Sequence, residues 1–568
     1  MAARLPPGAR RRAGSRVLQP RLIRPVSIPH AALAGALILG MLHGLAFAPA
    51  PFPAWFLPLL QLSTFGAMSW LVWRAATLKR AIWIGAAFGA GTFAVGVSWI
   101  YISLHVYAYM AAPLAALGVG LLAAYLSLYP ALATGLAWWL AQRPAGDAGP
   151  GRTASALVCI PALAAAWTGS EWLRGVLFTG FPWLNVGYAH VDGPLHGWAP
   201  LLGVYGVAFA STLAAAGLAW IVAAACRRGE AGVALRTGWP ALAAAVAALA
   251  VGLAGAAWSW VRPYGPALDV RLVQANIPLS DKFDPAQIWQ GMDLHRDLAE
   301  RPRADGRPVT LTVLPETAVP VFQDQLSAEA WKEWVDSAAV RGGTFALGVA
   351  MRDIRADRDY YYNSVITLDG QTAPERLVSG HVDRRYDKRH LVPFGEFVPP
   401  GFRWFVDEMV MPLGDFDRGQ PRQKPFDIGG QHIAMNICYE DVFGEELLPA
   451  VRPGASDPGA TILANVSNLA WFGNSLALPQ HLQMSRMRVR ETGRPMLRAT
   501  NTGMTAVVDA QARVVGELAP HTAGVLDATV QGTTGLTLYA RTGNAPILVL
   551  VAALLAALAW VRLARRQK

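Results

Sequence analysis

Three side chains with complementary chemistry follow apolar runs in the second half of the chain. Glu316 follows "VTLTVLP", Lys388 lies in "RRYDKRHLVPFGEFVP", and Cys438 follows "HIAMNI". A thiol is a weak nucleophile until a base removes its proton, and a nearby cation favours the thiolate. A carboxylate, an ammonium group and a thiol could together carry out nucleophilic acyl transfer.

Cysteine is rare, with three in 568 residues. Cys159 and Cys226 lie in long apolar stretches, where cysteine behaves as an apolar residue. Cys438 is the only cysteine between residues 263 and 540, so it cannot form a disulfide within that segment. A lone cysteine at a strand end is more often structural than catalytic. The glutamate and lysine motifs are what favour a catalytic role here.

The histidines of this segment are poorly placed to activate a thiol. His381 and His390 flank the lysine motif, and His432 and His481 are scattered. A carboxylate base combined with a lysine is the simpler alternative to a Cys–His pair. The chain shows no His/Cys/Asp cluster with the spacing of metal ligands, so we expect no metal and no cofactor.

The elements that must position these groups alternate between short β-rich runs and helical stretches. Helices are expected at 327–343 and 478–493. We expect strands at 268–277, 309–317, 343–351, 362–369, 376–383, 432–440, 460–468, 495–503 and 504–515. Strands that are apolar on both faces and alternate with helices indicate a layered α/β domain. Such domains collect functional groups at the carboxyl ends of their strands.

Long apolar stretches surround this segment and meet the length of a membrane span, about 20 residues. The fourth of these stretches, residues 109–141, is longer than a straight span needs, so we expect it to tilt, kink or include a re-entrant piece. The windows lie at 31–50, 53–73, 81–104, 109–141, 155–173, 196–226, 239–261 and 544–562. The expected domains are a basic arm (1–30), a membrane domain with seven spans (31–262), the α/β domain (263–540), and a final span with a basic tail (541–568).

The net charge of +11 is concentrated beside the spans. Segments on one side of eight alternating spans carry 19 of the 49 Lys and Arg, and two of the 38 acidic residues. Cytoplasmic loops are rich in Lys and Arg, so this side is predicted to be the cytoplasm. Both termini then lie in the cytoplasm and the α/β domain lies on the outer side. The basicity gives no indication of nucleic-acid binding.

The motifs resemble those of a known enzyme superfamily. In order and spacing, "VLPETAVP", "YDKRHLVPFGEFVP" and "NICYEDVFGE" are similar to the Glu–Lys–Cys motifs of the nitrilase (carbon–nitrogen hydrolase) superfamily. With the flanking spans, "QANIP", "YYNS", "TGFPWLNVGY" and the long run from "NLAWFGNS" to "ATNTG", residues 31–562 resemble the bacterial apolipoprotein N-acyltransferase family. The resemblance implies a multi-pass α-helical membrane protein of about eight spans with an inserted α/β nitrilase-like αββα sandwich.

The resemblance also implies a role for each site residue. Cys438 is expected to be the nucleophile, Glu316 the general base, and Lys388 the cation that stabilises the tetrahedral intermediate. Glu396 is expected to position the lysine or the base, although it could merely cap a turn or form a salt bridge. Supporting or substrate-binding roles are implied for Asn363, Tyr439, Glu440 and Phe283.

The implied reaction transfers a fatty acyl chain from a phospholipid to the N-terminal S-diacylglyceryl cysteine of apolipoproteins, through a thioester on the enzyme. The implied partners are a phospholipid donor (phosphatidylethanolamine), diacylglyceryl apolipoproteins and the lipid bilayer, with no nucleic acid. The implied location is the bacterial inner membrane, with the catalytic domain in the periplasm. Leu469 and Phe283 depart from the family pattern, where Asp and Trp are frequent, which concerns local packing or substrate fit.

Two other functions remain open. A membrane-anchored nitrilase-type amidase would share the first chemical step and use water as the acceptor, although a small soluble amide does not require eight spans. A transporter or receptor would be expected to carry paired charges within its spans, and the windows hold almost none. The apolar, aromatic segment 402–414 is expected to dip into lipid or cover the active site, with ordinary core as the alternative.

Overall fold

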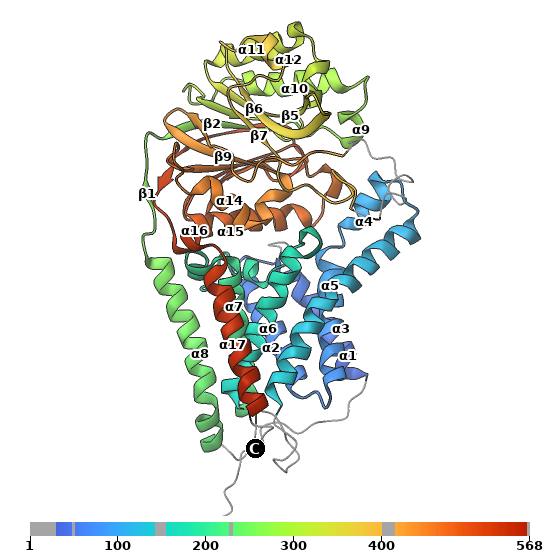
Figure 1. The fold of residues 1–568 in the computed structure, drawn as a ribbon, viewed down its shortest axis with the longest axis vertical. Helices are drawn as coiled ribbons and strands as arrows, with labels where there is room; N and C mark the ends of the chain where they lie inside the picture. The colour runs from blue at the N-terminus through green and yellow to red at the C-terminus, as the bar shows by residue number, and fades with distance from the viewer. Residues whose placement is uncertain are drawn as a thin grey trace, which may run out of the picture.

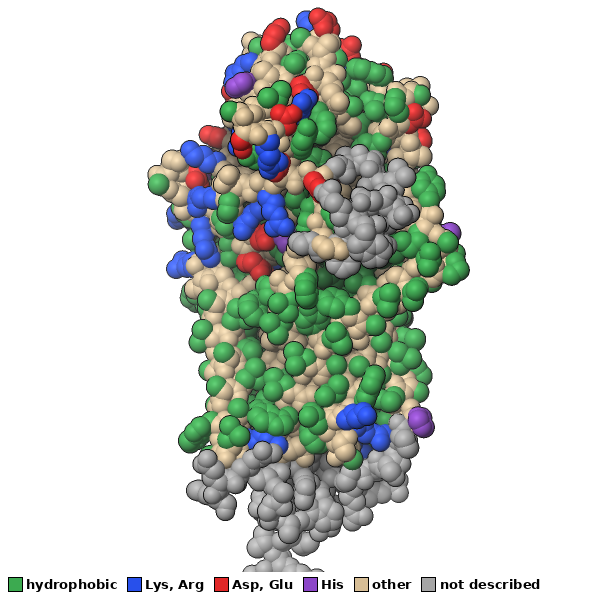
Figure 2. Space-filling view, turned by 45° about the vertical axis from the view of Figure 1, so that its right-hand side comes forward, with side chains coloured by type: hydrophobic (Ala, Val, Ile, Leu, Met, Phe, Trp, Pro, Cys, Tyr) green, Lys and Arg blue, Asp and Glu red, His purple; other side chains and the backbone are tan. Residues whose placement is uncertain are grey.

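The computed structural model describes residues 30–47, 52–142, 155–226, 231–399, 401 and 415–564, with the backbone alone for 231–238. Two parts are stacked along the long axis of the molecule, a bundle of long helices and an α/β domain above it (Figure 1). Figure 2 shows apolar side chains around the bundle, whereas acidic and basic side chains gather on the α/β domain. The molecule thus has the surface of a membrane protein with a polar domain on one side.

A helix occupies each of the eight predicted windows. Within the described residues, six helices are long and apolar enough to cross a membrane, a bent pair raises this to seven, and Ala31–Phe47 is shorter. The helices are α1 (Ala31–Gly44), α2 (Phe56–Trp73), α3 (Leu78–Gly96), α5 (Ala112–Ala141), α6 (Ala156–Val176), α7 (Ala199–Ala225), α8 (Ala231–Ala257) and α17 (Ala545–Ala564). A multi-pass helical membrane protein is confirmed, but the exact count of eight is not.

The break in a span falls in the third window rather than the fourth. The chain bends by 60° between α3 and the segment Ile100–Tyr107. By contrast, α5 is one helix of 30 residues that contains Pro130. At the bend, Trp99 Nε1 donates to Gly96 O and to Gln480 Oε1 of the α/β domain, both at 3.1 Å. A contact between the two parts therefore stabilises a bend that hydropathy does not predict.

The α/β domain contains two large sheets and a small pair, β1 (Arg262–Pro263) with β15 (Thr533–Thr534). The first sheet has the order β14–β2–β3–β5–β6–β7, with β4 beside β5, and its strands are β14 (Gly524–Val530), β2 (Leu268–Gln274), β3 (Leu311–Val313), β4 (Val319–Phe322), β5 (Thr344–Ile354), β6 (Asp359–Leu368) and β7 (Arg385–Asp387). The second has the order β13–β12–β11–β10–β9–β8, from β8 (Phe426–Ile428), β9 (Gln431–Ile437), β10 (Ile462–Ser467), β11 (Met496–Thr500), β12 (Ala506–Val508) and β13 (Val514–Glu517).

The sheets pack face to face across an apolar core that includes Leu272, Val313, Ile433, Ile437 and Val466. Helices cover both outer faces (Figure 1). The first sheet is covered by α10 (Ile288–Glu300), α11 (Ala328–Arg341) and α12 (Pro374–Val378), and the second by α14 (Gly444–Val451), α15 (Ala477–Thr492) and α16 (Leu538–Thr542). These four layers confirm the αββα sandwich that the family resemblance implies.

Two strand predictions are wrong. Residues 376–383 form the end of α12 and a turn, because Pro374 begins the helix and Gly380, with φ of 74°, follows its end. The run at 504–515 is two antiparallel strands, β12 and β13, rather than one. The segment 402–414 lies outside the described residues, as does most of the basic arm.

Polar contacts connect α15, one of the helices that cover the second sheet, to the membrane helix α7. Glu491 of α15 accepts a hydrogen bond from Val204 N at 2.7 Å, next to Gly203, whose φ of 70° breaks the geometry of α7. Arg488 forms an ion pair with Glu491 at 3.0 Å and donates to Val442 O at 3.2 Å. Since Val442 belongs to the turn that begins at Cys438, one ion pair connects that turn to α7.

Candidate active site

Glu316 lies in the turn between β3 and β4, at the carboxyl end of β3. Thr317 has φ of 50°, a strained conformation for a residue with a side chain. The turn lies directly against Gly348 of β5, where a Cβ would be 2.5 Å from Thr317 N and 2.7 Å from Glu316 Cα. The lack of a side chain at Gly348 therefore lets the glutamate approach the sheet this closely.

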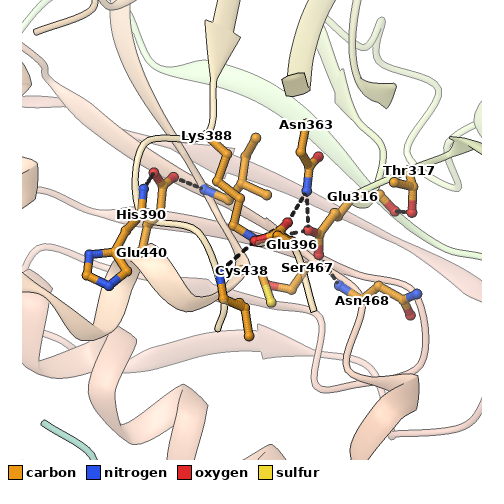
Figure 3. A network of polar contacts seen from close by, with 12 residues as sticks. Glu316, Thr317, Asn363, Lys388, His390, Glu396, Cys438, Glu440, Ser467 and Asn468 are labelled. Atoms are coloured by element: carbon orange, nitrogen blue, oxygen red, sulfur yellow. Dashed lines mark hydrogen bonds and ion pairs between the residues drawn. The ribbon is translucent and has the colours of Figure 1, made fainter. Parts of the chain in front are cut away.

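Both carboxylate oxygens of Glu316 are held (Figure 3). Asn363 Nδ2 donates to Oε1 at 2.8 Å, and Lys388 Nζ lies 3.3 Å from the same oxygen. The backbone N–H of Asn468 donates to Oε2 at 2.9 Å. Asn363 and Lys388 are expected from their sequence motifs, whereas Asn468 contributes a backbone group that no side-chain motif reveals.

Lys388 follows β7 and is 1% exposed. Its backbone N–H donates to Asn363 O at 2.8 Å, and its Nζ donates to Glu396 Oε1 at 2.8 Å. Glu396 also accepts hydrogen bonds from Asn363 Nδ2 at 2.8 Å and from Val392 N at 2.9 Å. The ammonium group is thus bound by two carboxylates, and Glu396 both forms a salt bridge and fixes its own loop.

Cys438 lies where β9 ends and a 3₁₀ turn (Cys438–Val442) begins. Its φ is 52°, a region that residues with side chains enter rarely and that often marks functional sites. Asn465 Nδ2 donates to the carbonyl oxygen of Cys438 at 3.1 Å. In Figure 3 the sulfur lies among the side chains of Glu396, Lys388 and Glu316. The first sheet therefore supplies the charged groups and the second supplies the thiol.

Burial and charge set the resting protonation state. Burial alone would raise the pKa of Glu316, but the charge of Lys388 and the hydrogen bond from Asn363 outweigh it and hold the pKa below its usual value. Burial would lower the pKa of Lys388, but the charges of Glu316 and Glu396 raise it. Burial and the charge of Glu316 raise the pKa of Cys438 more than Lys388 lowers it. At neutral pH Glu316 is therefore a carboxylate, Lys388 an ammonium group and Cys438 a protonated thiol.

The charge of Lys388 therefore does not outweigh the burial of Cys438 and the charge of Glu316, which together favour the thiol. Lys388 is already bound by Glu396 at 2.8 Å and lies 3.3 Å from Glu316, so its charge is largely neutralised within the cluster. Cys438 becomes a nucleophile when its proton passes to the carboxylate during attack. A thiol is also much less reactive toward oxidants than a thiolate, so the resting site protects Cys438.

Glu440 joins the turn at Cys438 to the loop after Lys388. The side chain is buried, and each oxygen accepts two hydrogen bonds. The donors are Ile437 N (2.6 Å), Tyr386 Oη (2.9 Å), Arg389 N (2.6 Å) and His390 N (3.1 Å). Glu440 therefore sets the separation between the thiol and the ammonium group without touching either.

A second buried network, which no sequence motif predicts, lies beneath the turn. Asp441 Oδ1 accepts from His481 Nε2 at 2.6 Å, and Ser485 donates to the other carboxylate oxygen. Arg498 Nη2 donates to His481 Nδ1 at 2.7 Å, and its Nη1 lies 3.3 Å from Asp441 Oδ2. Since arginine can only donate, His481 carries its proton on Nε2. The histidine thus supports the turn rather than activating the thiol.

Tyr439 faces the loop between α6 and α7. Its hydroxyl donates to Gly180 O at 3.2 Å, and its ring stacks with Trp183 at a centroid distance of 6.3 Å. Trp183 also stacks on His481 at 5.8 Å, and its Nε1 donates to Gln480 Oε1 at 2.7 Å. The residue after the candidate nucleophile is therefore in contact with the membrane helices' own loop.

Phe283 and Leu469 lie outside the charged cluster. Phe283 follows the short helix α9 (Leu279–Lys282), and it is Lys282 that reaches Glu316, donating from Nζ to the backbone oxygen at 2.9 Å. Leu469, which departs from the family pattern, is buried. A Cβ at Gly503 would lie 2.9 Å from its Cδ1, so the side chain is tightly packed. Among the residues that the structure describes, no group of three His, Cys, Asp or Glu side chains could hold a metal ion.

Known proteins match both parts of the chain. Residues 269–539 match the carbon–nitrogen hydrolase family, and residues 39–217 match the apolipoprotein N-acyltransferase N-terminal domain. The apolipoprotein N-acyltransferase of Bordetella bronchiseptica is 50% identical over 530 residues, which are 92% of this chain and 95% of that protein. The apolipoprotein N-acyltransferase of Ralstonia nicotianae is 47% identical over 91% of this chain and 92% of its own length.

Solved structures are similar to about half of the chain. A carbon–nitrogen hydrolase from Helicobacter pylori G27 is 14% identical, with a TM-score of 0.34, over 47% of this chain and 90% of that chain. An amidase from Nesterenkonia sp. is 19% identical, with a TM-score of 0.33, over 51% of this chain and 97% of that chain. The sequence relatives decide the family, because their identity extends over both parts of the chain. The chain is an acyltransferase and belongs to the apolipoprotein N-acyltransferase family.

Proposed function

We propose that this acyltransferase transfers a fatty acyl chain from a phospholipid to the α-amino group of the N-terminal S-diacylglyceryl cysteine of apolipoproteins. Phosphatidylethanolamine is the proposed donor. Glu316, Lys388 and Cys438 are the proposed catalytic residues, supported by Asn363, Glu396, Tyr439 and Glu440. The scheme requires no cofactor, because a thiol, a base and a cation suffice for acyl transfer through a thioester.

In the first step, Cys438 attacks the ester carbonyl carbon while its proton passes to Glu316. Lys388 and the backbone N–H of Tyr439 stabilise the oxyanion, and one such donor contributes about 3 kcal/mol to catalysis. The intermediate collapses, the carbon–oxygen bond of the ester breaks, and Glu316 returns the proton to the leaving oxygen. Lysophospholipid departs and a thioester remains on Cys438.

In the second step, the α-amino group of the apolipoprotein attacks the thioester. Such an amine has a pKa of about 8, so a useful fraction is neutral near pH 7. Glu316 accepts a proton from the attacking nitrogen, the carbon–sulfur bond breaks, and the proton returns to the sulfur of Cys438. The product is an amide and the enzyme regains its resting thiol, which gives ping-pong kinetics.

The observation that favours lipid substrates is the position of the nucleophile turn on the helical bundle. Tyr439 contacts Gly180 O, and Arg488 connects Val442 to Glu491 and hence to α7. Removing an acyl chain from the bilayer costs about 0.8 kcal/mol per CH₂ group. A thiol held at the end of the membrane helices can receive acyl chains that stay in the bilayer, which a soluble amide would not require.

The proposed orientation places the α/β domain in the periplasm and both termini in the cytoplasm of a bacterial inner membrane. Figure 2 shows basic side chains at the end of the bundle farthest from the α/β domain. Arg74 directly follows α2, and Lys79 and Arg80 lie in the first turn of α3. Cytoplasmic ends of membrane helices are enriched in such residues. The proposed domain limits remain 1–30, 31–262, 263–540 and 541–568.

The intact mass of purified enzyme mixed with phosphatidylethanolamine tests this function. We expect the mass to rise by one fatty acyl chain and to fall again when a diacylglyceryl-cysteine peptide is added, with N-acylation of the peptide. An adduct discharged by water alone would favour the other candidate, a membrane-anchored amidase or hydrolase. Folded enzyme that forms no adduct with any phospholipid would contradict the thioester mechanism.

We expect Glu440→Ala to slow acyl transfer about 100-fold, because misplacing catalytic groups by about 1 Å has an effect of this size. The substitution leaves three backbone N–H groups and the hydroxyl of Tyr386 without their acceptor, which separates Lys388 from Cys438. Single-turnover kinetics measure the rate. Glu375→Ala, at an exposed glutamate of α12, is the matched control, and equal rates for the two variants would show that Glu440 has no positioning role.

A further inference from the structure

A second lysine is buried beside the catalytic glutamate. Lys282 ends α9 and is 3% exposed, although lysine side chains are almost never fully buried without a partner. Its Nζ donates to the backbone oxygen of Glu316 at 2.9 Å. Lys282 has no role in the proposed acyl transfer and lies outside the three motifs around Glu316, Lys388 and Cys438, so its burial has another cause.

The segment that carries Lys282 is tied to the same groups that hold the glutamate. Asn501 binds the backbone of Ile277 twice, accepting from its N–H at 3.0 Å and donating to its oxygen at 2.8 Å. Asn501 Nδ2 also donates to Asn468 Oδ1 at 3.2 Å, and the N–H of Asn468 binds the carboxylate of Glu316. Asn501 and Asn468 therefore connect the loop that leads to Lys282 with the carboxylate of Glu316.

Hydrogen bonding alone does not explain a lysine at this position. The hydroxyl of Thr317 already donates to the same backbone oxygen of Glu316 at 2.8 Å. A neutral residue at 282 would leave that oxygen satisfied and would avoid the desolvation of an ammonium group. What lysine adds is a positive charge close to a carboxylate that must stay ionised.

The charges around the two residues are few. Lys282 faces Glu316 and, from α10, His295, whose Nδ1 is bonded to Gly291 O at 2.8 Å. Burial lowers the pKa of Lys282 to about 7, although the charge of Glu316 opposes this shift. Glu316 in turn faces three other titratable groups, Lys388, Glu396 and Cys438, and the charge of Lys282 is one of the causes that lower its pKa.

We propose that Lys282 is a positioning residue for the acylation step: it fixes the backbone of Glu316 and, together with Lys388, keeps the carboxylate ionised so that it can accept the proton of Cys438. The proposal rests on the function proposed above and adds a second cation to the base. Lys388 binds the carboxylate and is placed to reach the oxyanion. Lys282 binds the main chain of the same residue and acts on the reaction through Glu316.

The test is the pH dependence of acyl-enzyme formation in the full-length enzyme, measured by intact mass with phosphatidylethanolamine. A cation favours the ionised carboxylate, so removing it raises the pKa of Glu316 and moves the acidic limb of the rate profile to higher pH. For Lys282→Met we expect a shift of about one pH unit, the lower end of the effect of a nearby opposite charge. Lys282→Arg keeps the charge and is expected to leave the limb in place.

Lys332→Met, at an exposed lysine of α11, is the matched control and should behave as the wild type. If Lys282→Met does not fold, Lys282→Gln replaces it in the same measurement. A lower plateau with an unmoved acidic limb would show a merely structural lysine and would overturn the proposal. A wild-type enzyme that forms no acyl-enzyme at any pH would instead overturn the function on which the proposal rests, so the two failures are distinguishable.

Discussion

Replacing Cys438 by alanine is expected to abolish the acyl-enzyme and to reduce N-acylation by at least about 10⁴-fold. Removing a nucleophile from a site that works as a unit leaves only substrate binding and oxyanion stabilisation. Cys438 has a backbone φ of 52°, and its side chain lies among the charged groups of the first sheet. The other two cysteines, Cys159 and Cys226, lie elsewhere in the chain, so neither can replace it. Intact mass after incubation with phosphatidylethanolamine measures the adduct, and peptide N-acylation measures the overall reaction.

The two remaining cysteines provide a matched control. Cys159 lies in α6 and Cys226 directly follows α7, both distant in sequence from the site. A Cys159→Ala/Cys226→Ala enzyme retains Cys438 as its single thiol and should form the adduct with wild-type yield. If this double variant lost the adduct while Cys438→Ala kept it, the nucleophile would have been assigned to the wrong residue.

Lys388→Met is expected to slow acyl-enzyme formation by at least about 10³-fold, and two effects contribute. Loss of one oxyanion-stabilising donor costs about 10²- to 10³-fold. In addition, Glu316 and Glu396, which both bind Asn363 Nδ2 at 2.8 Å, would be left as two buried carboxylates without their cation. One of them then takes up a proton at higher pH, so Glu316 is less often available as the base.

The pH profile separates these effects. Loss of the cation raises the pKa of Glu316, so the acidic limb of the rate should move to higher pH, while loss of oxyanion stabilisation lowers the rate at every pH. Breaking a buried pair also destabilises a protein by about 3–5 kcal/mol, which thermal unfolding of the detergent-solubilised enzyme would detect. Lys424→Met, at an exposed lysine, is the control. A rate within tenfold of wild type and an unmoved limb would exclude Lys388 from catalysis.

The sequence predicts those parts of the site that follow recognisable strand ends. Glu316 comes after "TVLP" and Cys438 after "MNI", and both lie at the carboxyl ends of strands as expected. Lys388 and Glu396 are eight residues apart in one loop, so their contact is local. Motif spacing therefore carries enough information for the groups that the proposed mechanism uses directly.

The supporting contacts could not be predicted, because they join residues far apart in the chain that share no local pattern. Asp441 meets His481 and Arg498, which lie 40 and 57 residues later. From the sequence, Lys282 would be expected to be an exposed lysine in a polar loop. It is buried because α9 packs beside Glu316. The protonated resting thiol likewise follows from burial and from the charge of Glu316 rather than from residue types.

Fold prediction failed where local propensity was weak. Residues 376–383 contain β-branched valines yet form a helix end and a turn, since Pro374 and Gly380 set the local backbone. At the 60° bend in the third window, Trp99 donates a hydrogen bond to Gln480, which lies 381 residues later in the chain. The sandwich itself was implied by family resemblance, because alternating strands and helices fit several α/β folds equally well.

The division of the site between the two sheets has a consequence for how the enzyme matures. Glu316 and Lys388 are attached to the first sheet and Cys438 to the second, and the packing of the two sheets brings them together. A newly made chain whose sheets have not yet closed carries a cysteine with no proton acceptor, and is inert toward the phospholipids around it. In the proposed mechanism, closure of the sandwich is therefore the step that makes Cys438 reactive.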